Sequence, residues 1–224
     1  MLALIVGASR GLGLALTEEY LKRGWQVVAT ARGGGTGLHE LAARSKDLTI
    51  ETLDINEPDQ IAALRARLSG RAFDLLFVNA GVSNDPTEKI GEVSTETFVR
   101  VMTTNALGPM RVVETFESLV KPEGTIGVMS SGLGSIAENE SGGWEVYRAS
   151  KAALNMLMKS YVARKAGARP HIIIAPGWVR TDMGGPRATL SIEDSIPRVV
   201  DVITSQAGRP GLRYMSYQGR EVKW

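Results

Sequence analysis

The chain has 224 residues, a length that fits one α/β domain, and its 43% apolar and 22% charged content is ordinary for a globular protein. The absence of cysteine excludes disulfides, a thiolate nucleophile and a zinc site built on sulfur, and we predict no metal site. The formal net charge is +2 and the Lys and Arg residues are scattered, so we expect no nucleic-acid surface. The apolar run at residues 2–6 is too short for a signal peptide or a membrane span, which predicts a cytoplasmic protein with no membrane partner.

Short apolar runs alternate with longer stretches of 3.6-residue periodicity, a pattern typical of a parallel sheet covered by helices. Strands are predicted over residues 2–6, 25–30, 48–53, 73–78, 125–129, 171–175 and 212–216. Helices are predicted over residues 11–23, 38–44, 95–120, 144 to about 166 and 192–204, and one more follows residue 56. We therefore predict an α/β chain with a single Rossmann domain over residues 1–224, in which helices cover both faces of a doubly wound, mostly parallel, seven-stranded sheet.

Local signals fix some helix ends. Gly24 is expected to end the first helix in a left-handed conformation. Asn56 resembles an N-cap, with Pro58 in the first turn that follows. The long helix over residues 95–120 is expected to turn three apolar side chains inward, Phe98, Val101 and Met102.

A glycine-rich turn joins the first predicted strand to the first helix. Its glycines are Gly7, Gly11 and Gly13, and the turn also contains Ser9, Arg10 and Leu12. Backbone N–H groups at such a helix start face an anion, and residues without side chains let a pyrophosphate approach closely. An ordinary strand-to-helix turn is the alternative, but the position of this turn between the right elements favours a dinucleotide site.

The residues after the second strand indicate which dinucleotide binds. NAD sites usually place an acidic residue there, whereas this chain continues Thr30-Ala31-Arg32. Arg10 and Arg32 would suit a 2′-phosphate, because the guanidinium group matches phosphate geometry. NADP(H) is therefore favoured over NAD(H), with Arg32 as a solvated loop residue being the alternative. Asp54 ends the third strand and is placed either to bond an adenine amino group or to cap a helix.

Tyr147 and Lys151 lie four residues apart on a predicted helix, so they share one face. A free tyrosine has a pKa of about 10. A nearby ammonium group and a cationic nicotinamide would both lower that pKa toward the range useful for acid/base work. An exposed helical pair is the alternative. The glycine turn upstream is an independent cofactor motif, and its presence in the same chain favours the catalytic interpretation.

Ser130 and Ser131 end the fifth strand, on the carboxyl edge where ligands of such folds bind. A serine hydroxyl there could hold a substrate carbonyl beside Tyr147, although both could be plain turn residues. Neither sits in a nucleophile elbow. His39 and His171 are placed poorly for a triad, and we predict that both are structural.

In sequence order, these motifs resemble those of the short-chain dehydrogenase/reductase family, and the likeness covers nearly the whole chain. The motifs are Gly7-x-x-x-Gly11-x-Gly13, Asn79-Ala80-Gly81, Asn105, Ser131, Tyr147-x-x-x-Lys151 and Pro176-Gly177. Within the family the chain is similar to the carbonyl-reductase-like subgroup that includes the sniffer and C-factor proteins.

The resemblance implies a catalytic tetrad. Tyr147 would be the acid/base, Ser131 would orient the carbonyl, and Lys151 would bind the nicotinamide ribose and lower the pKa of the tyrosine. Asn105 would hold a water that links Lys151 to solvent. The implied cofactor-binding residues are Gly7, Ser9, Arg10, Gly11, Leu12, Gly13, Arg32, Asp54, Ile55, Asn79, Ala80, Gly81, Tyr147, Lys151, Pro176, Gly177, Val179 and Thr181.

Two departures from the family pattern concern the substrate. The segment from Ser131 to Tyr147 is longer than usual, which predicts a reshaped substrate mouth, and the lid region after Thr181 is short, which predicts an open site. The resemblance also implies a homodimer or homotetramer that pairs through the helices preceding Lys121 and around residues 147–166.

The sequence leads to one preferred function and two alternatives. The preferred function is NADPH-dependent reduction of a small-molecule ketone or aldehyde to an alcohol, with Tyr147 supplying the proton. A cofactor-binding regulator or signalling protein of the C-factor type is the second hypothesis. An epimerase or dehydratase ranks last, because such relatives usually carry a larger substrate domain and a differently spaced glycine turn.

Overall fold

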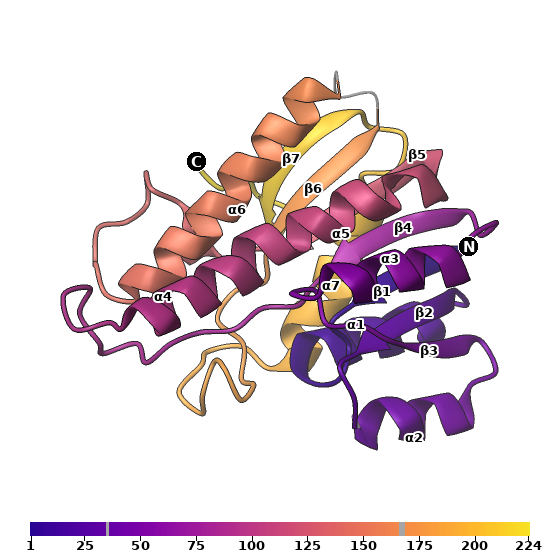
Figure 1. Ribbon diagram of the computed structural model, residues 1–224, viewed down its shortest axis with the longest axis horizontal. Helices are drawn as coiled ribbons and strands as arrows, with labels where there is room; N and C mark the ends of the chain where they lie inside the picture. The colour runs from indigo at the N-terminus through magenta and orange to yellow at the C-terminus, as the bar shows by residue number, and fades with distance from the viewer. Residues whose placement is uncertain (35, 166–168) are drawn as a thin grey trace.

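The computed structural model describes residues 1–34, 36–165 and 169–224, and a seven-stranded parallel sheet runs through its centre (Figure 1). The strand order is β3-β2-β1-β4-β5-β6-β7, and every neighbouring pair is parallel. The strands are β1 (Leu2–Val6), β2 (Gln26–Ala31), β3 (Leu48–Thr52), β4 (Phe73–Val78), β5 (Val120–Met129), β6 (Pro170–Ala175) and β7 (Gly211–Ser216). The predicted doubly wound α/β fold is confirmed, and the named strands are parallel throughout rather than mostly parallel.

Helices form a layer on each face of this sheet. The helices are α1 (Gly11–Lys22), α2 (Thr36–Arg44), α3 (Pro58–Arg67), α4 (Thr95–Met102), α5 (Gly108–Phe116), α6 (Glu145–Arg164) and α7 (Ile192–Thr204). Apolar side chains of α3, α5 and α6 share one buried cluster with the sheet, and those of α1, α2 and α7 share the other. Alternate residues of one strand enter the two clusters, as Leu4 and Ile5 do in β1.

The order of the strands reverses at β1. Strands β2 and β3 follow β1 on one side of it, whereas β4 and all later strands lie on the other side. The loops that leave the carboxyl ends of β1 and β4 therefore diverge to opposite faces of the sheet. Ligands of such sheets bind outside the carboxyl ends at this switch point, which is where the glycine turn lies.

The helix predicted over residues 95–120 is not continuous. It divides into α4, a π-helical turn (Thr103–Leu107), α5 and a short 3-10 turn (Glu117–Leu119), and β5 begins at Val120 rather than at residue 125. Pro109 has no N–H group to donate to the carbonyl of Asn105, which opens the α-helical ladder at this point. Phe98 is 39% exposed, so its predicted inward orientation is wrong, whereas Val101 is buried as predicted.

Most other predicted ends differ from the structure by one or two residues. Gly24 has φ +77° after the C-cap residue Arg23, as expected of a glycine that ends a helix. The N-cap of α3 is Glu57 rather than Asn56, because the Asn56 amide turns away to donate to Thr104 Oγ1 at 3.1 Å. Helix α6 starts one residue after Trp144, and its predicted end near Ala166 lies outside the described residues.

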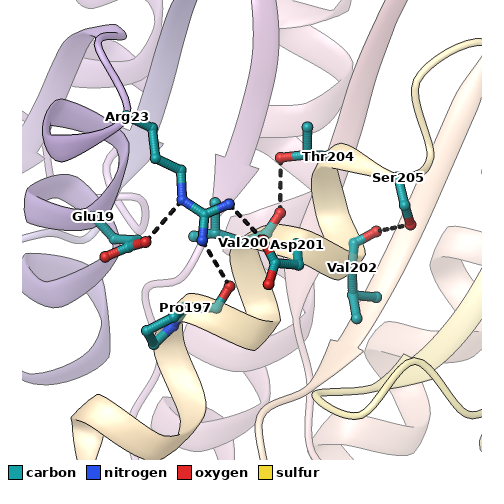
Figure 2. A network of polar contacts seen from close by, with 8 residues as sticks. All are labelled: Glu19, Arg23, Pro197, Val200, Asp201, Val202, Thr204 and Ser205. Atoms are coloured by element: carbon teal, nitrogen blue, oxygen red, sulfur yellow. Dashed lines mark hydrogen bonds and ion pairs between the residues drawn. The ribbon is translucent and has the colours of Figure 1, made fainter.

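A polar clamp joins α1 to α7 on the face of the sheet that they cover (Figure 2). The guanidinium group of Arg23 donates to Glu19 on its own helix at 2.7 Å, and to Asp201 at 2.6 Å on α7. It also donates to the carbonyl of Pro197 at 3.0 Å. The clamp holds α1, which follows the glycine turn, against α7, which follows the loop at residues 176–191.

Candidate active site

The glycine turn leaves β1 with a backbone that only glycine tolerates. Gly7 has φ +86°, and a Cβ atom there would lie 2.7 Å from the backbone of Ala80. A Cβ atom on Gly13 would lie 2.0 Å from the carbonyl oxygen of Gly7. These glycines let the turn fold tightly against β4, while Gly11 has φ +55° and begins α1.

Side-chain and backbone bonds hold the turn against its neighbouring strands. Asn79 Nδ2 donates to the carbonyl of Gly7 at 2.8 Å, and Ala8 N donates to the carbonyl of Thr30 at 2.7 Å. The Thr30 hydroxyl also accepts from Gly7 N at 3.2 Å. The start of Asn79-Ala80-Gly81 therefore supports the glycine turn directly.

The two predicted cations lie on neighbouring loops of this edge. Arg10 precedes α1 and Arg32 follows β2, whose last residues pair with those of β1. Arg10 forms an exposed ion pair with Asp182 at 2.8 Å, and Arg32 lies 3.8 Å from Asp54. Asp54 Oδ1 also accepts from Asn56 N at 2.9 Å, so its carboxylate organises the turn before α3.

Two more predicted cofactor residues contribute mainly apolar packing. Ile55 is 4% exposed and packs against Gly108, where an added Cβ atom would lie 3.0 Å from it. Leu12 is half-buried and packs against the core cluster of α1 and α7. Ser9, within the turn, is also half-buried.

Tyr147 and Lys151 occupy the buried face of α6. Tyr147 is 9% exposed and Lys151 is 3% exposed, and the ammonium nitrogen lies 5.7 Å from the centre of the tyrosine ring. Lys151 Nζ donates to the carbonyl of Met129, at the end of β5, at 2.9 Å. The i, i+4 spacing thus places both groups together at the carboxyl edge, and an exposed helical pair is ruled out.

Burial shifts the pKa of each group in the direction that favours its neutral form. Burial raises the pKa of Tyr147 to about 12, against which a hydrogen bond with the Ser131 side chain acts. Burial also lowers the pKa of Lys151 to about 8. The direction at Tyr147 is opposite to the one expected from the sequence, because loss of hydration outweighs the effect of Ser131.

Asn105 lies in the π-helical turn and is fully buried. Its side chain bonds both backbone groups of Val82, with Oδ1 accepting from N at 2.8 Å and Nδ2 donating to O at 2.7 Å. Nδ2 also donates to Ser150 Oγ at 2.9 Å, and Ser150 donates to the carbonyl of Tyr147 at 2.7 Å. Asn105 therefore joins the loop after β4 to the helix that carries Tyr147.

Gly81 marks the point at which Asn105 and Lys151 face each other. A Cβ atom on Gly81 would lie 3.3 Å from Asn105 Oδ1 and 3.4 Å from Lys151 Nζ. A larger residue would fill the space between these two polar groups. The glycine thus keeps both groups accessible to one small bridging molecule.

The two serines after β5 differ in their surroundings. Ser131 Oγ accepts from Leu133 N at 3.1 Å, and its side chain lies near enough to the phenol of Tyr147 to act against the rise in that pKa. Ser130 is 2% exposed and donates to Asn155 Oδ1 at 2.7 Å. The structure therefore brings Ser131 beside Tyr147. Ser130 instead joins the end of β5 to α6 through Asn155.

The segment after β6 folds back on itself beside the glycine turn. Gly177 has φ +85°, and Ser195 Oγ donates to the carbonyl of Pro176 at 2.7 Å. Val179 pairs with Leu190 in an isolated β-bridge, so the region after it forms a short closed loop. Thr181 lies against Gly11, since a Cβ atom added to Gly11 would lie 3.7 Å from the methyl group of Thr181.

Trp144 is a site residue that the sequence did not single out. Its backbone is left-handed, with φ 54° and ψ 34°, and its ring meets the Tyr147 ring edge-on at 5.8 Å. Such a conformation is costly for a bulky residue. Arg148 holds it by donating to the carbonyls of Gly143 at 2.9 Å and Gly142 at 3.0 Å.

Two further neighbours of Ser131 were also missed. Asn155 lies eight residues after Tyr147 on one helix, so its helical spacing was a usable signal. Tyr214 donates its hydroxyl to the carbonyl of Ser131 from β7. No local pattern marks Tyr214, because only the tertiary fold brings its strand to the site.

Both histidines lie away from this cluster. His171 is 1% exposed on β6, and burial lowers its pKa to about 4. His39 lies on α2, at the far edge of the sheet. Across residues 1–34, 36–165 and 169–224, no group of three or more His, Asp or Glu side chains could hold a metal ion. The described helices include none that is long and apolar enough to cross a membrane.

A reversed parallel sheet, a glycine turn at its switch point and a buried tyrosine–lysine pair on its carboxyl edge define the class of nicotinamide-dinucleotide oxidoreductases. Residues 1–189 match the family described as short chain dehydrogenase. The chain therefore belongs to the short-chain dehydrogenase/reductase family, as the sequence motifs indicated.

Two solved structures are similar over the whole chain, and one curated relative is similar over two thirds of it. A Burkholderia multivorans protein solved with bound NADP is 61% identical, with a TM-score of 0.98, covering 100% of this chain and 99% of that chain. A carbonyl reductase from Pseudomonas aeruginosa PAO1, in complex with NADP, is 36% identical, with a TM-score of 0.92 and the same coverage. The C-signal protein of Myxococcus xanthus is 39% identical over 157 residues, covering 67% of this chain and 92% of that protein.

Proposed function

We propose that this oxidoreductase reduces a ketone or aldehyde carbonyl of a small molecule to an alcohol with NADPH, using Tyr147 as the acid. The single observation that carries the proposal is the placement of the Ser131 and Tyr147 side chains together beside the buried Lys151. The similarity to carbonyl reductases of known structure supports it. The physiological carbonyl is set by the loops at 132–146 and 182–195.

The residues at the switch point fit NADP(H). The glycine turn leaves room that a Cβ atom would fill. The N-cap residue of α1 is Arg10, whose side chain has no hydrogen-bond acceptor and so does not cap the helix. The amino end of α1 is thus free to bind a pyrophosphate. Arg10 and Arg32 hold only exposed, weak ion pairs, which a 2′-phosphate can replace.

The carbonyl oxygen would be held by Tyr147 and Ser131. NADPH, when bound, supplies the hydride that reaches the carbonyl carbon. The phenol of Tyr147 is protonated near neutral pH and would donate that proton to the oxygen. Ser131 adds a second hydrogen bond to the same oxygen, which favours the developing negative charge.

Lys151 and Asn105 would restore the proton to Tyr147. A group with a pKa of about 8, as Lys151 has, exchanges protons readily near neutral pH. Asn105 Oδ1 and Lys151 Nζ face the same space above Gly81, where a water molecule would connect them. We propose this relay as the route by which the phenol regains its proton.

The experiment is a panel of ketones and aldehydes tested with NADPH and NADH side by side, for the wild type and Tyr147→Phe. We expect NADPH to be preferred. Removing the acid should lower kcat by a factor of roughly 10² to 10⁴ with little change in the Kd for NADPH. A Tyr147→Phe variant with wild-type turnover would refute the mechanism.

A second candidate function is a cofactor-binding regulator. The similarity to the Myxococcus C-signal favours it. It predicts tight NADPH binding with no carbonyl in the panel oxidising the cofactor. The paired Ser131 and Tyr147 argue against it, because nucleotide binding alone does not require a serine beside the phenol.

We also propose that the chain forms a homodimer or homotetramer through α4, α5 and α6. Exposed apolar side chains lie on α4 and α6 and on the π-helical turn that leads into α5, namely Phe98, Val99, Leu107, Met156 and Leu157. A cluster of that kind favours contact with a second protein surface. The single-domain organisation and the cytoplasmic location remain predictions from the sequence.

A further inference from the structure

Tyr214 lies on β7, which is not adjacent to β5, but its side chain reaches the active-site residue Ser131 that follows β5. It lies on β7 opposite Ile173 of β6, which in turn pairs with Val128 of β5. Its side chain crosses β6, and its hydroxyl donates to the carbonyl of Ser131, three residues beyond Val128. Only 2% of Tyr214 is exposed, so this bond is shielded from water.

Ser131 is fixed by several bonds at once. Its carbonyl accepts from Gly134 N at 2.9 Å as well as from Tyr214, and its Oγ accepts from Leu133 N at 3.1 Å. Because the amide of Leu133 occupies a lone pair of Oγ, the hydroxyl proton stays free to donate to another group. The backbone bonds therefore fix the position of Oγ.

Tyr214 is itself held in a buried polar network. Its hydroxyl lies beside the side chains of Asn155 and Ser130. Ser130 donates to Asn155 Oδ1 at 2.7 Å, and Asn155 Nδ2 donates to the carbonyl of Gly134 at 3.2 Å. The network thus joins the end of β5, the turn after it, α6 and β7 at one point.

The last residues of the chain cover this network. Val222 N donates to the carbonyl of Tyr214 at 2.8 Å, and the Trp224 ring packs 5.7 Å from the Tyr214 ring. The Trp224 carbonyl accepts from Ala137 N at 3.0 Å, in the loop before α6. Lys159 on α6 holds the outer side of that indole, with its ammonium nitrogen 4.6 Å from the ring.

We propose that Tyr214, backed by Trp224, is a positioning residue that sets the orientation of Ser131 for catalysis. The proposal rests on the proposed reductase function. Tyr214 acts through the backbone of Ser131 and does not itself contact the carbonyl. The C-terminal segment 222–224 would then be part of the active-site scaffold rather than a free tail.

The first test is Tyr214→Phe, which removes the hydroxyl and keeps the buried ring. We expect kcat with a carbonyl substrate to fall about tenfold, the effect of losing one hydrogen bond, with the Kd for NADPH unchanged. The matched control is Tyr20→Phe, another fully buried tyrosine, which lies at the opposite edge of the sheet and should keep wild-type kcat. Wild-type kcat in Tyr214→Phe would overturn the proposal.

A double-mutant cycle then separates positioning from general loosening. If Tyr214 acts through Ser131, adding Tyr214→Phe to Ser131→Ala should lower kcat no further than Ser131→Ala alone. Multiplicative losses would overturn the proposal, because they would show that Tyr214 acts independently of the serine. Trp224→Ala should give the same non-additive pattern with a smaller loss.

Amide hydrogen exchange distinguishes a failure of this proposal from a failure of the reductase function. Exchange at Leu133 and Gly134 should be faster in Tyr214→Phe than in the wild type, and unchanged in Tyr20→Phe. This result would support the anchoring of Ser131 even if the wild type reduced no carbonyl in the panel. Equal exchange in wild type and Tyr214→Phe would overturn the anchoring whatever the activity.

Discussion

Lys151 and Tyr147 show how far the properties of single residues follow from spacing. Their four-residue separation was enough to place them on one face of α6, which the structure confirms. The direction of the Tyr147 pKa shift was not predictable, because it depends on burial that only the tertiary fold creates. Tyr214 was beyond reach for the same reason, since its contact with Ser131 spans three strands.

The lowered pKa of Lys151 predicts how the stability of the fold depends on pH. The lysine pKa falls from 10.5 to about 8 on folding, so the unfolded chain binds more protons between these values. The free energy of unfolding should therefore rise with pH across that window. Below it, the buried ammonium group costs stability in the folded state.

Lys151→Met removes this titration and tests the sign. Thermal melts of both proteins measure the Tm of the variant minus that of the wild type. We expect this difference to be greatest near pH 7. That relative advantage should shrink as the pH rises from about 8 to 10.5. A difference in Tm that stays constant over this range would contradict the assigned burial of the charged group.

At the scale of elements, the parallel sheet and the β1–α1 turn were predictable because they depend on local periodicity and on glycine. The kinked helix over residues 95–119 was not, although Pro109 was a visible warning. Phe98 was assigned inward together with Val101 and Met102, as part of one continuous helix. In the structure α4 contacts α6 and the π-helical turn instead, which leaves that ring partly exposed.

Gly13→Ala tests the close approach in the β1–α1 turn. The added methyl group would lie 2.0 Å from the carbonyl oxygen of Gly7 and 2.6 Å from Asn79 Nδ2, so the turn must move. We expect a loss of stability of about 1–3 kcal/mol or more, and weaker NADPH binding, measured by melting and titration. Gly37→Ala is the control, since its methyl group meets only the flexible end of Leu14. Equal effects of the two substitutions would contradict the tight turn.

At the scale of the whole molecule, the fold class followed from the alternation of short apolar runs and helical stretches. The seven-stranded parallel sheet and the two helical layers agree with that prediction. The substrate did not follow, because it depends on loops such as that held by Arg148 around Trp144. Those loops carry little periodic signal in the sequence.

The proposed oligomer is tested by its size in solution. Sedimentation should show the wild type as a dimer or tetramer and Met156→Glu as a smaller species, because the charge would enter the apolar helical face. Ile136→Glu is a matched control, since Ile136 is also exposed but lies in the loop before α6. A monomeric wild type would contradict the proposed assembly.

The central claim is that the chain transfers hydride to a carbonyl with Tyr147 as the acid. The most direct measurement is the reaction of NADPH carrying deuterium at both C4 positions with a reducible carbonyl, followed by mass spectrometry and NMR of the alcohol. We predict deuterium on the carbinol carbon with the wild type and at least about 100-fold slower product formation with Tyr147→Phe, at equal NADPH occupancy. Alcohol formed without deuterium at that carbon, or formed at the same rate by Tyr147→Phe, would contradict the claim.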